Sequence, residues 1–291
     1  MKKTLIALAA LGVVGAASAQ VSISGGMDLA IQNIRGAAGG VTMTNGRNIT
    51  NNITFRGSED LGGGMSAGAM VSITPNGEDG SAAAPALGGN GQYVNLSGGF
   101  GDIKLGYWLK PAFTATQTAN STKGVTGFTA RLGQVDNDGV YQANQVLYTS
   151  PSISGLTFQY SYAPSETAAT AAETGLMLGY SAGALVVNYA MNDTAAAGQL
   201  SLLSGSYDMG AAKVFATMTS RDTGSSTNLG VSIPFGAVTV WADNTQNKIT
   251  DITTTQLGAK YALSKRTTVY GAYGTQSAAA NGMNVGISHT F

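Results

Sequence analysis

The chain ends in Asn284-Val285-Gly286-Ile287-Ser288-His289-Thr290-Phe291, a run in which apolar and polar residues alternate. Successive side chains of a β-strand point to opposite faces, so a period of two indicates a strand with one apolar and one polar face. The same alternation occurs upstream at residues 49–56, 156–162, 185–189 and 229–233. No convincing helical stripe follows residue 20, and the best candidate, around 115–130, is weak. The sequence therefore predicts an all-β protein.

The composition excludes several classes of function. Charged residues make up 10% of the 291 residues, against about 25% in an average soluble domain. The 15 basic and 15 acidic residues cancel, which argues against a nucleic-acid partner because phosphate binding needs clustered cations. There is no Cys and only one His, His289, so neither disulfides nor a zinc or His-based catalytic centre is expected. We therefore expect no enzyme, no catalytic residue, no cofactor and no metal.

The N-terminus has the features of an export signal. Lys2 and Lys3 precede an apolar run over residues 5–15, and Ala17-Ser18-Ala19 has the small-x-small pattern of a cleavage site. We expect a signal peptide over residues 1–19, export through the Sec pathway and cleavage between Ala19 and Gln20. The mature domain, residues 20–291, holds no run of 18 apolar residues that could span a membrane as a helix.

The connections between the predicted strands alternate in length. Seven are short turns, at 58–63, 98–101, 150–152, 181–183, 208–210, 234–236 and 263–266. Eight are longer, at 34–47, 74–90, 109–143, 164–173, 193–198, 220–225, 246–251 and 276–281. Together they join 16 strands, and short turns alternating with longer loops are typical of an outer-membrane barrel. We predict a 16-stranded antiparallel transmembrane β-barrel with periplasmic turns and external loops.

The scarcity of charge separates a membrane barrel from a soluble one. A soluble barrel exposes a charged face, whereas the polar face here consists mostly of Ser, Thr, Asn, Gln and Gly. In a membrane barrel the apolar face meets lipid and the polar face lines water. Aromatic residues near strand ends would form the interfacial girdle: Tyr107, Tyr148, Tyr162, Tyr180, Tyr189, Phe235, Tyr261 and Phe291.

At the level of motifs, the chain resembles the general porins of β-proteobacteria, the trimeric outer-membrane family of neisserial, burkholderial and comamonad type. The resemblance rests on residues 55–64 (FRGSEDLGGG), 93–106 (YVNLSGGFGDIKLG), 146–151 with Gly155, and 261–267 with 286–291. It implies a homotrimer in the cell outer membrane, in contact with lipid and lipopolysaccharide, that passes small hydrophilic solutes and ions. It also implies a third loop folded into the lumen, and the longest connection, 109–143, is the third.

Candidate pore-lining residues come from this loop and from the strand pattern. On the loop, Asp136 and Asp138 form an acidic pair near Arg131. On the wall, the period of two turns six residues inward: Asp28, Asn52, Arg56, Lys104, Lys213 and Lys260. The family normally lines this wall with several Arg, but Asn52 and Ser288 stand where the pattern commonly has Arg, and only Arg56 is cleanly retained. We therefore expect weak charge selectivity.

Other interpretations remain open at this point. A substrate-selective channel would need a file of aromatics along the lumen, and only Trp108 and Trp241 could point inward by strand parity. A plugged, structural barrel would not conduct. The terminal Phe291 is expected, from the resemblance, to be the signal read by the barrel-assembly machinery.

Overall fold

The computed structural model describes residues 20–35, 40–75, 77, 86–119, 139–166, 171–194, 198–277 and 281–291. Its strands are β1 (Gln20–Arg35), β2 (Val41–Asn45), β3 (Asn52–Gly62), β4 (Met65–Thr74), β5 (Ala86–Gly98), β6 (Gly101–Leu109), β7 (Tyr141–Thr149), β8 (Leu156–Ala163), β9 (Glu173–Ala182), β10 (Leu185–Thr194), β11 (Gly198–Asp208), β12 (Lys213–Arg221), β13 (Gly224–Phe235), β14 (Val238–Asn247), β15 (Ile252–Ala262), β16 (Thr267–Gln276) and β17 (Asn281–Thr290). A helix, α2 (Pro111–Ala119), follows β6. No described helix is long and apolar enough to cross a membrane.

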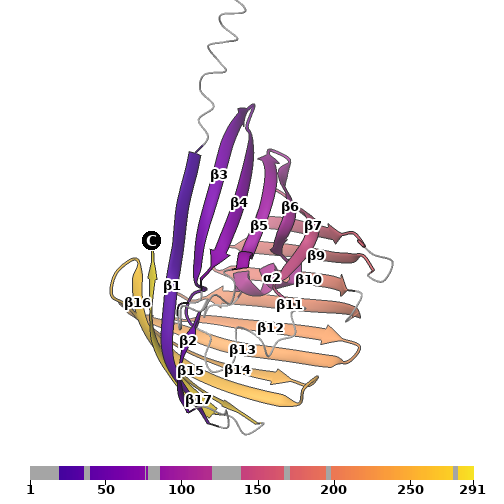
Figure 1. The fold of residues 1–291 in the computed structure, drawn as a ribbon. Helices are drawn as coiled ribbons and strands as arrows, with labels where there is room; N and C mark the ends of the chain where they lie inside the picture. Colours follow the sequence, from indigo (N-terminus) through magenta and orange to yellow (C-terminus); the bar gives the residue numbers. More distant parts are fainter. Residues whose placement is uncertain are drawn as a thin grey trace, which may run out of the picture.

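The strands form one closed antiparallel barrel (Figure 1). From β3 to β17 each strand pairs with the next along the chain, β2 and β3 both pair with β1, and β1 closes the ring against β17 from Gly26↔Thr290 to Arg35↔Asn281. Closure leaves no sheet edge, which is the condition for burying strands in a bilayer. The 17 strand segments make 16 barrel strands, because β2 and β3 both pair with β1 and are two pieces of one strand. The predicted fold class is confirmed.

All seven predicted short turns lie at one end of the barrel, here called the turn end. Their backbones are stabilised locally by side chains. Asp60 accepts from the Gly62 N–H at 2.8 Å, and Ser264 accepts from Arg266 and Thr267 N–H at 3.1 and 3.0 Å. Gly63 and Gly210 have φ of 62° and 80°, the left-handed region that turns between strands require and glycine adopts without strain. The longer connections leave from the opposite, loop end.

The two faces of the wall differ as the alternation predicts. In β15, Gln256 is 6% exposed while Leu257 is 56% exposed, and in β17 Asn284 is 3% exposed while Val285 is 59% exposed. Large apolar side chains therefore cover the outside and polar ones the inside. The girdle prediction holds for Phe235 and Tyr261, which are exposed at the turn end. It fails for Tyr189, which lies in the middle of β10 because that strand begins only at Leu185.

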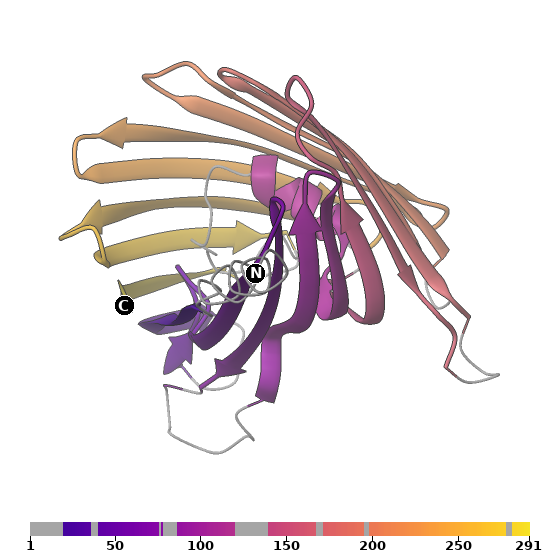
Figure 2. The ribbon, with the colours of Figure 1, turned by 90° about the horizontal axis from the view of Figure 1, so that it is seen from above.

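The helix α2 lies inside the barrel, where it packs against β9, β10, β11 and β12 (Figure 2). The weak helical candidate of the sequence, around 115–130, overlaps only the second half of α2, and the helix begins four residues earlier. Pro111 starts the helix, a position where its missing N–H costs nothing. Neither an acidic first turn nor a basic last turn marks the helix ends, so packing rather than sequence pattern determines it.

Candidate functional site: the wall of the lumen

An apolar patch on the otherwise polar inner wall holds α2. Ala112 and Ala115 of the helix are fully buried. They belong to one buried cluster with four inward-facing wall residues: Met177, Ala190, Leu200 and Leu202. Small residues on the helix let it approach the sheet closely, and the wall residues exclude water from the contact. The first part of the third loop is thus fixed to one side of the lumen by hydrophobic packing.

Polar contacts hold the middle of α2. The carbonyl of Ala115 accepts from Ser204 Oγ at 2.8 Å and from Asn188 Nδ2 at 3.2 Å. Just before the helix, Lys110 Nζ lies 3.4 Å from Glu173 Oε2 at the start of β9. The two wall side chains therefore bind the backbone of the helix directly, and the helix and the strands β10 and β11 are joined by polar as well as apolar contacts. The contacts fix the helix in position along the wall.

The acidic pair expected at the constriction lies further along the same connection. Arg131, Asp136 and Asp138 fall outside the described residues, so their roles stay predictions. Ala19, at the expected cleavage site, also lies outside the described residues, and the cleavage stays a prediction. Gln20 is the first residue of β1.

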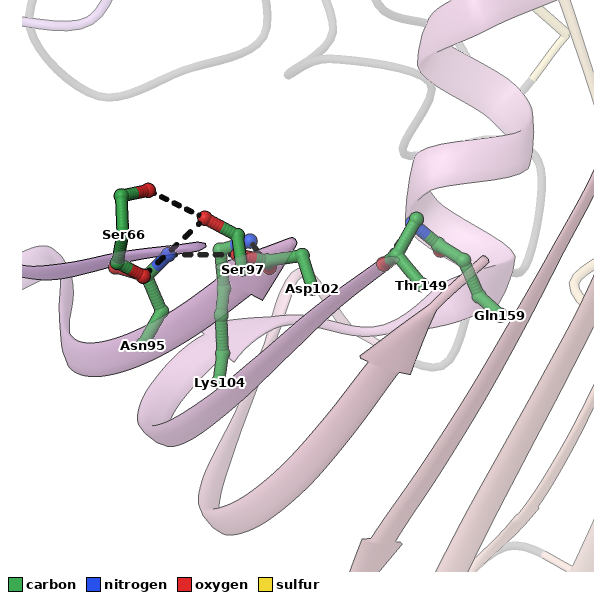
Figure 3. Close-up of polar contacts among 7 residues, drawn as sticks. All are labelled: Ser66, Asn95, Ser97, Asp102, Lys104, Thr149 and Gln159. Carbon is green, nitrogen blue, oxygen red and sulfur yellow. Dashed lines mark hydrogen bonds and ion pairs between the residues drawn. The ribbon is translucent and has the colours of Figure 1, made fainter. Parts of the chain in front are cut away.

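Lys104 lies on the inner wall, where an acid neutralises it. Its ammonium forms an ion pair with Asp102, two residues earlier on β6. Asn95 Nδ2 donates to the other oxygen of Asp102 at 2.6 Å, and the ring centre of Tyr93 lies 5.3 Å from Lys104 Nζ. Figure 3 shows Asn95, Asp102 and Lys104 of this cluster between two hydroxyl-containing contacts, Ser66 with Ser97 and Thr149 with Gln159. The row spans β4 to β8 and carries no net charge.

Arg56 is exposed and lies in a recess of the lumen wall. The recess has a volume of about 320 Å³, and its lining includes Asn52, Trp108 and Tyr141. Trp108 contacts Tyr93 edge-on with ring centroids 4.9 Å apart. Two of the predicted wall residues, Arg56 and Asn52, are therefore brought together, with an aromatic surface beside them.

Two further cations occupy inward positions near the turn end. Lys213 is the first residue of β12 and Lys260 lies close to the end of β15, and both are partly buried. Neither lysine lines the recess that contains Arg56, so these two cations and Arg56 do not form one cluster.

Asp28 faces inward, but it does not line the open pore. Its side chain is 0% exposed, because residues 46–51 fold over it. Its carboxylate accepts from the backbone N–H groups of Asn48 and Ile49, and its other oxygen accepts from Tyr270 Oη at 2.5 Å. The prediction of Asp28 as a pore-lining charge is wrong, because its charge is fully engaged in holding another segment.

Sequence reasoning missed three acids of the inner wall: Asp102 and Glu173, which pair with Lys104 and Lys110, and Asp243. Asp243 faces inward on β14, where Asn228 and Gln256 each donate to it at 3.4 Å. Strand parity could have found it, since it lies two residues after the inward Trp241. Strand parity would also have placed Asp102 on the inner face, because it lies two residues before the inward Lys104. Glu173 falls in the predicted loop 164–173, and only the structure, in which it begins β9, shows that Lys110 lies beside it.

A closed barrel of this size, apolar outside, polar inside and narrowed by an internal helix, defines a membrane channel for hydrophilic solutes. The apolar exterior places it in a bilayer, and the polar interior admits water.

The chain belongs to the Gram-negative porin family, whose model matches residues 4–281. It is 31% identical to the outer membrane porin protein 32 of Delftia acidovorans, over 93% of this chain and 88% of that protein. It is also 28% identical to the major outer membrane protein P.IB of Neisseria gonorrhoeae, over 60% of this chain and 51% of that one. The fold matches the anion-selective porin from Comamonas acidovorans with a TM-score of 0.78 at 24% identity, covering 94% and 100% of the two chains.

The protein is therefore an outer-membrane porin, a water-filled channel for passive diffusion of small hydrophilic solutes and ions. The family and the fold point to a channel rather than an enzyme.

Proposed function

We propose that this porin is a general diffusion channel with weak charge selectivity, and that its anion preference is smaller than is typical of its family. The observation that carries the proposal is the pairing of wall charges. Lys104 is neutralised by Asp102, Lys110 lies beside Glu173, and Asp243 adds an inward acid. Selectivity depends on uncompensated charge facing the permeating ion, and the pairing of Lys104 and Lys110 removes part of it. Arg56 is the exposed cation that remains in the recess.

Reversal potentials across a planar bilayer in a KCl gradient test this proposal. We expect a small anion preference, with a permeability ratio below about 3 in favour of chloride. Arg56→Gln should shift the potential further toward zero, and Asp102→Asn should shift it toward anions because it frees Lys104. Lys265→Gln, in an exposed turn, is the matched control and should leave the potential unchanged. A permeability ratio above about 10 would contradict the proposal.

The alternative is a channel selective for a particular solute. Trp108 beside Arg56 favours it locally, but Trp241, the other inward tryptophan, is 4% exposed and offers no continuing aromatic surface. We therefore expect solute flux that rises linearly with concentration. Saturating flux, or block of the current by one solute, would support the alternative instead.

We further propose that the chain works as a homotrimer in lipid and lipopolysaccharide, and that Phe291 is read by the barrel-assembly machinery. Phe291 is the final residue, its backbone pairs with Gly25 at 3.2 and 3.0 Å, and its ring is exposed at the turn end. An exposed aromatic ring next to the closing strand is accessible to a partner. Slow migration of the unheated protein on a gel, lost on heating, is the expected sign of the trimer.

A further inference from the structure

Between β2 and β3, the strand that follows the first outer loop contains more residues than the stretch of β1 with which it pairs. Gly26 pairs with Asn52 and Leu29 pairs with Asn45, so two residues of β1 face six residues, 46–51, on the neighbouring strand. Four residues are therefore in excess. We call residues 46–51 the bulge segment. A bulge of this kind interrupts the ladder and must satisfy its own backbone groups.

The bulge segment lies on the inner side of the barrel. Besides the contacts of Asp28 with the backbone of Asn48 and Ile49, Asn48 Nδ2 donates to Ser288 Oγ at 2.6 Å. Asp28, Tyr270 and Ser288 are inward residues of β1, β16 and β17, which meet where the barrel closes. The segment thus covers the closing seam from within the lumen.

Hydrogen bonds replace the interrupted ladder at this point. The backbone N–H of Asp28 donates to Asn51 Oδ1 at 2.6 Å, and its carbonyl accepts from Gly46 N–H at 3.2 Å. Asn48, Asn51 and Asp28 are all less than 10% exposed. A buried polar network with its groups paired is rigid, because opening it exposes unsatisfied donors and acceptors. The bulge segment is therefore a fixed part of the wall.

The bulge segment also borders the recess that contains Arg56. Ile49 and Thr50 line that recess together with Asn52, Arg56 and Trp108. A segment that projects inward beside the exposed cation reduces the cross-section available to a solute there. The helix α2 lies elsewhere on the ring, against β9 to β12, so the two inward elements rest on different parts of the wall.

We propose that the bulge segment is a second, fixed constriction of this pore, and that Asp28 is the positioning residue that holds it. Asp28 does not contact the solute; it anchors the segment that does. This inference concerns pore size, so it is independent of the weak charge preference proposed above.

The decisive variant removes the excess residues. Deleting residues 47–50 leaves Gly46 opposite Asp28 and Asn51 opposite Met27, which continues β2 into β3 as one regular strand. Residue 51 would then point to lipid, so the deletion is combined with Asn51→Val. We expect the barrel to assemble, single-channel conductance to rise by about 1.5-fold or more, and larger polyethylene glycols to enter the pore. An assembled variant with unchanged conductance and an unchanged polymer cutoff would overturn the proposal.

Substitutions of Asp28 test the anchor separately. Asp28→Leu leaves two buried backbone N–H groups and the Tyr270 hydroxyl without an acceptor, so the segment should loosen, with higher current noise and a cutoff shifted toward that of the deletion. Asp28→Asn can still accept from both N–H groups and donate to Tyr270, so it should restore wild-type behaviour. Tyr270→Phe removes one bond and is the matched control. Equal effects of all three variants would argue against an anchoring role.

Labelling of an introduced cysteine tests the proposed constriction even if the deletion variant does not assemble into a barrel. The chain has no Cys, so Thr50→Cys introduces a single thiol on the bulge segment. A water-soluble methanethiosulfonate reagent is expected to lower the conductance of this variant and not that of the wild type. Unchanged current after complete labelling would overturn the proposal.

Discussion

Leu257→Lys is expected to lower the free energy of unfolding by about 2–4 kcal/mol, the cost of a lysine on the lipid face at the bilayer midplane. Leu257 is the sixth of the 11 residues of β15 and is 56% exposed on the outer face. Lipid offers an ammonium neither water nor a counter-charge, and from the middle of the strand the side chain reaches the interface poorly. Denaturant unfolding of the barrel in lipid vesicles measures the change.

The adjacent residue provides the control for this substitution. Gln256 faces the lumen and already donates to Asp243 at 3.4 Å. Gln256→Lys places the same cation one residue away, beside the Asp243 carboxylate on the lumen side, so a change within about 1 kcal/mol is expected. Similar losses from both variants would contradict the assignment of the outer face to lipid.

Ala115→Arg is expected to displace α2 from the wall and to lower the mean single-channel conductance by about 2-fold or more, with increased current noise. The Ala115 side chain is 0% exposed within the apolar cluster, so an arginine has no space there and no partner for its charge. The helix must move toward the lumen, and its bonds to Asn188 and Ser204 are lost.

Gln117→Arg separates packing from charge in this experiment. Gln117 lies on the same helix and is partly exposed, so its arginine can extend into the aqueous lumen. We expect a conductance close to that of the wild type, with a small shift in ion preference. If both variants lower the conductance equally, added charge rather than loss of packing controls the pore.

Much of the architecture was predictable because it depends on local chemistry. Alternation identified the strands, and turn residues such as Asp60 with Gly62, or Ser264, form their bonds within three positions of the chain. The same parity placed Lys104 on the inner wall. These features could be read from the sequence because each one depends on residues that are neighbours along it.

The helix escaped sequence analysis because its stabilising partners are distant. Ala115 is held by Leu202 and Ser204, about 90 positions away, and only barrel closure brings them together. The apolar residues of β11 show the site in retrospect: Leu200 and Leu202 face inward where a strict alternation would have polar side chains.

The sequence by itself determined that this chain is an outer-membrane barrel with 16 strands, because alternation and turn chemistry repeat in every hairpin. Only the tertiary structure decided what its charges do. Asp28 was expected in open water, yet Tyr270, which lies 242 positions along the chain, and the bulge segment enclose it. Whether a charged side chain is paired or buried depends on which strands barrel closure brings together. The number of charges along the chain therefore does not predict it.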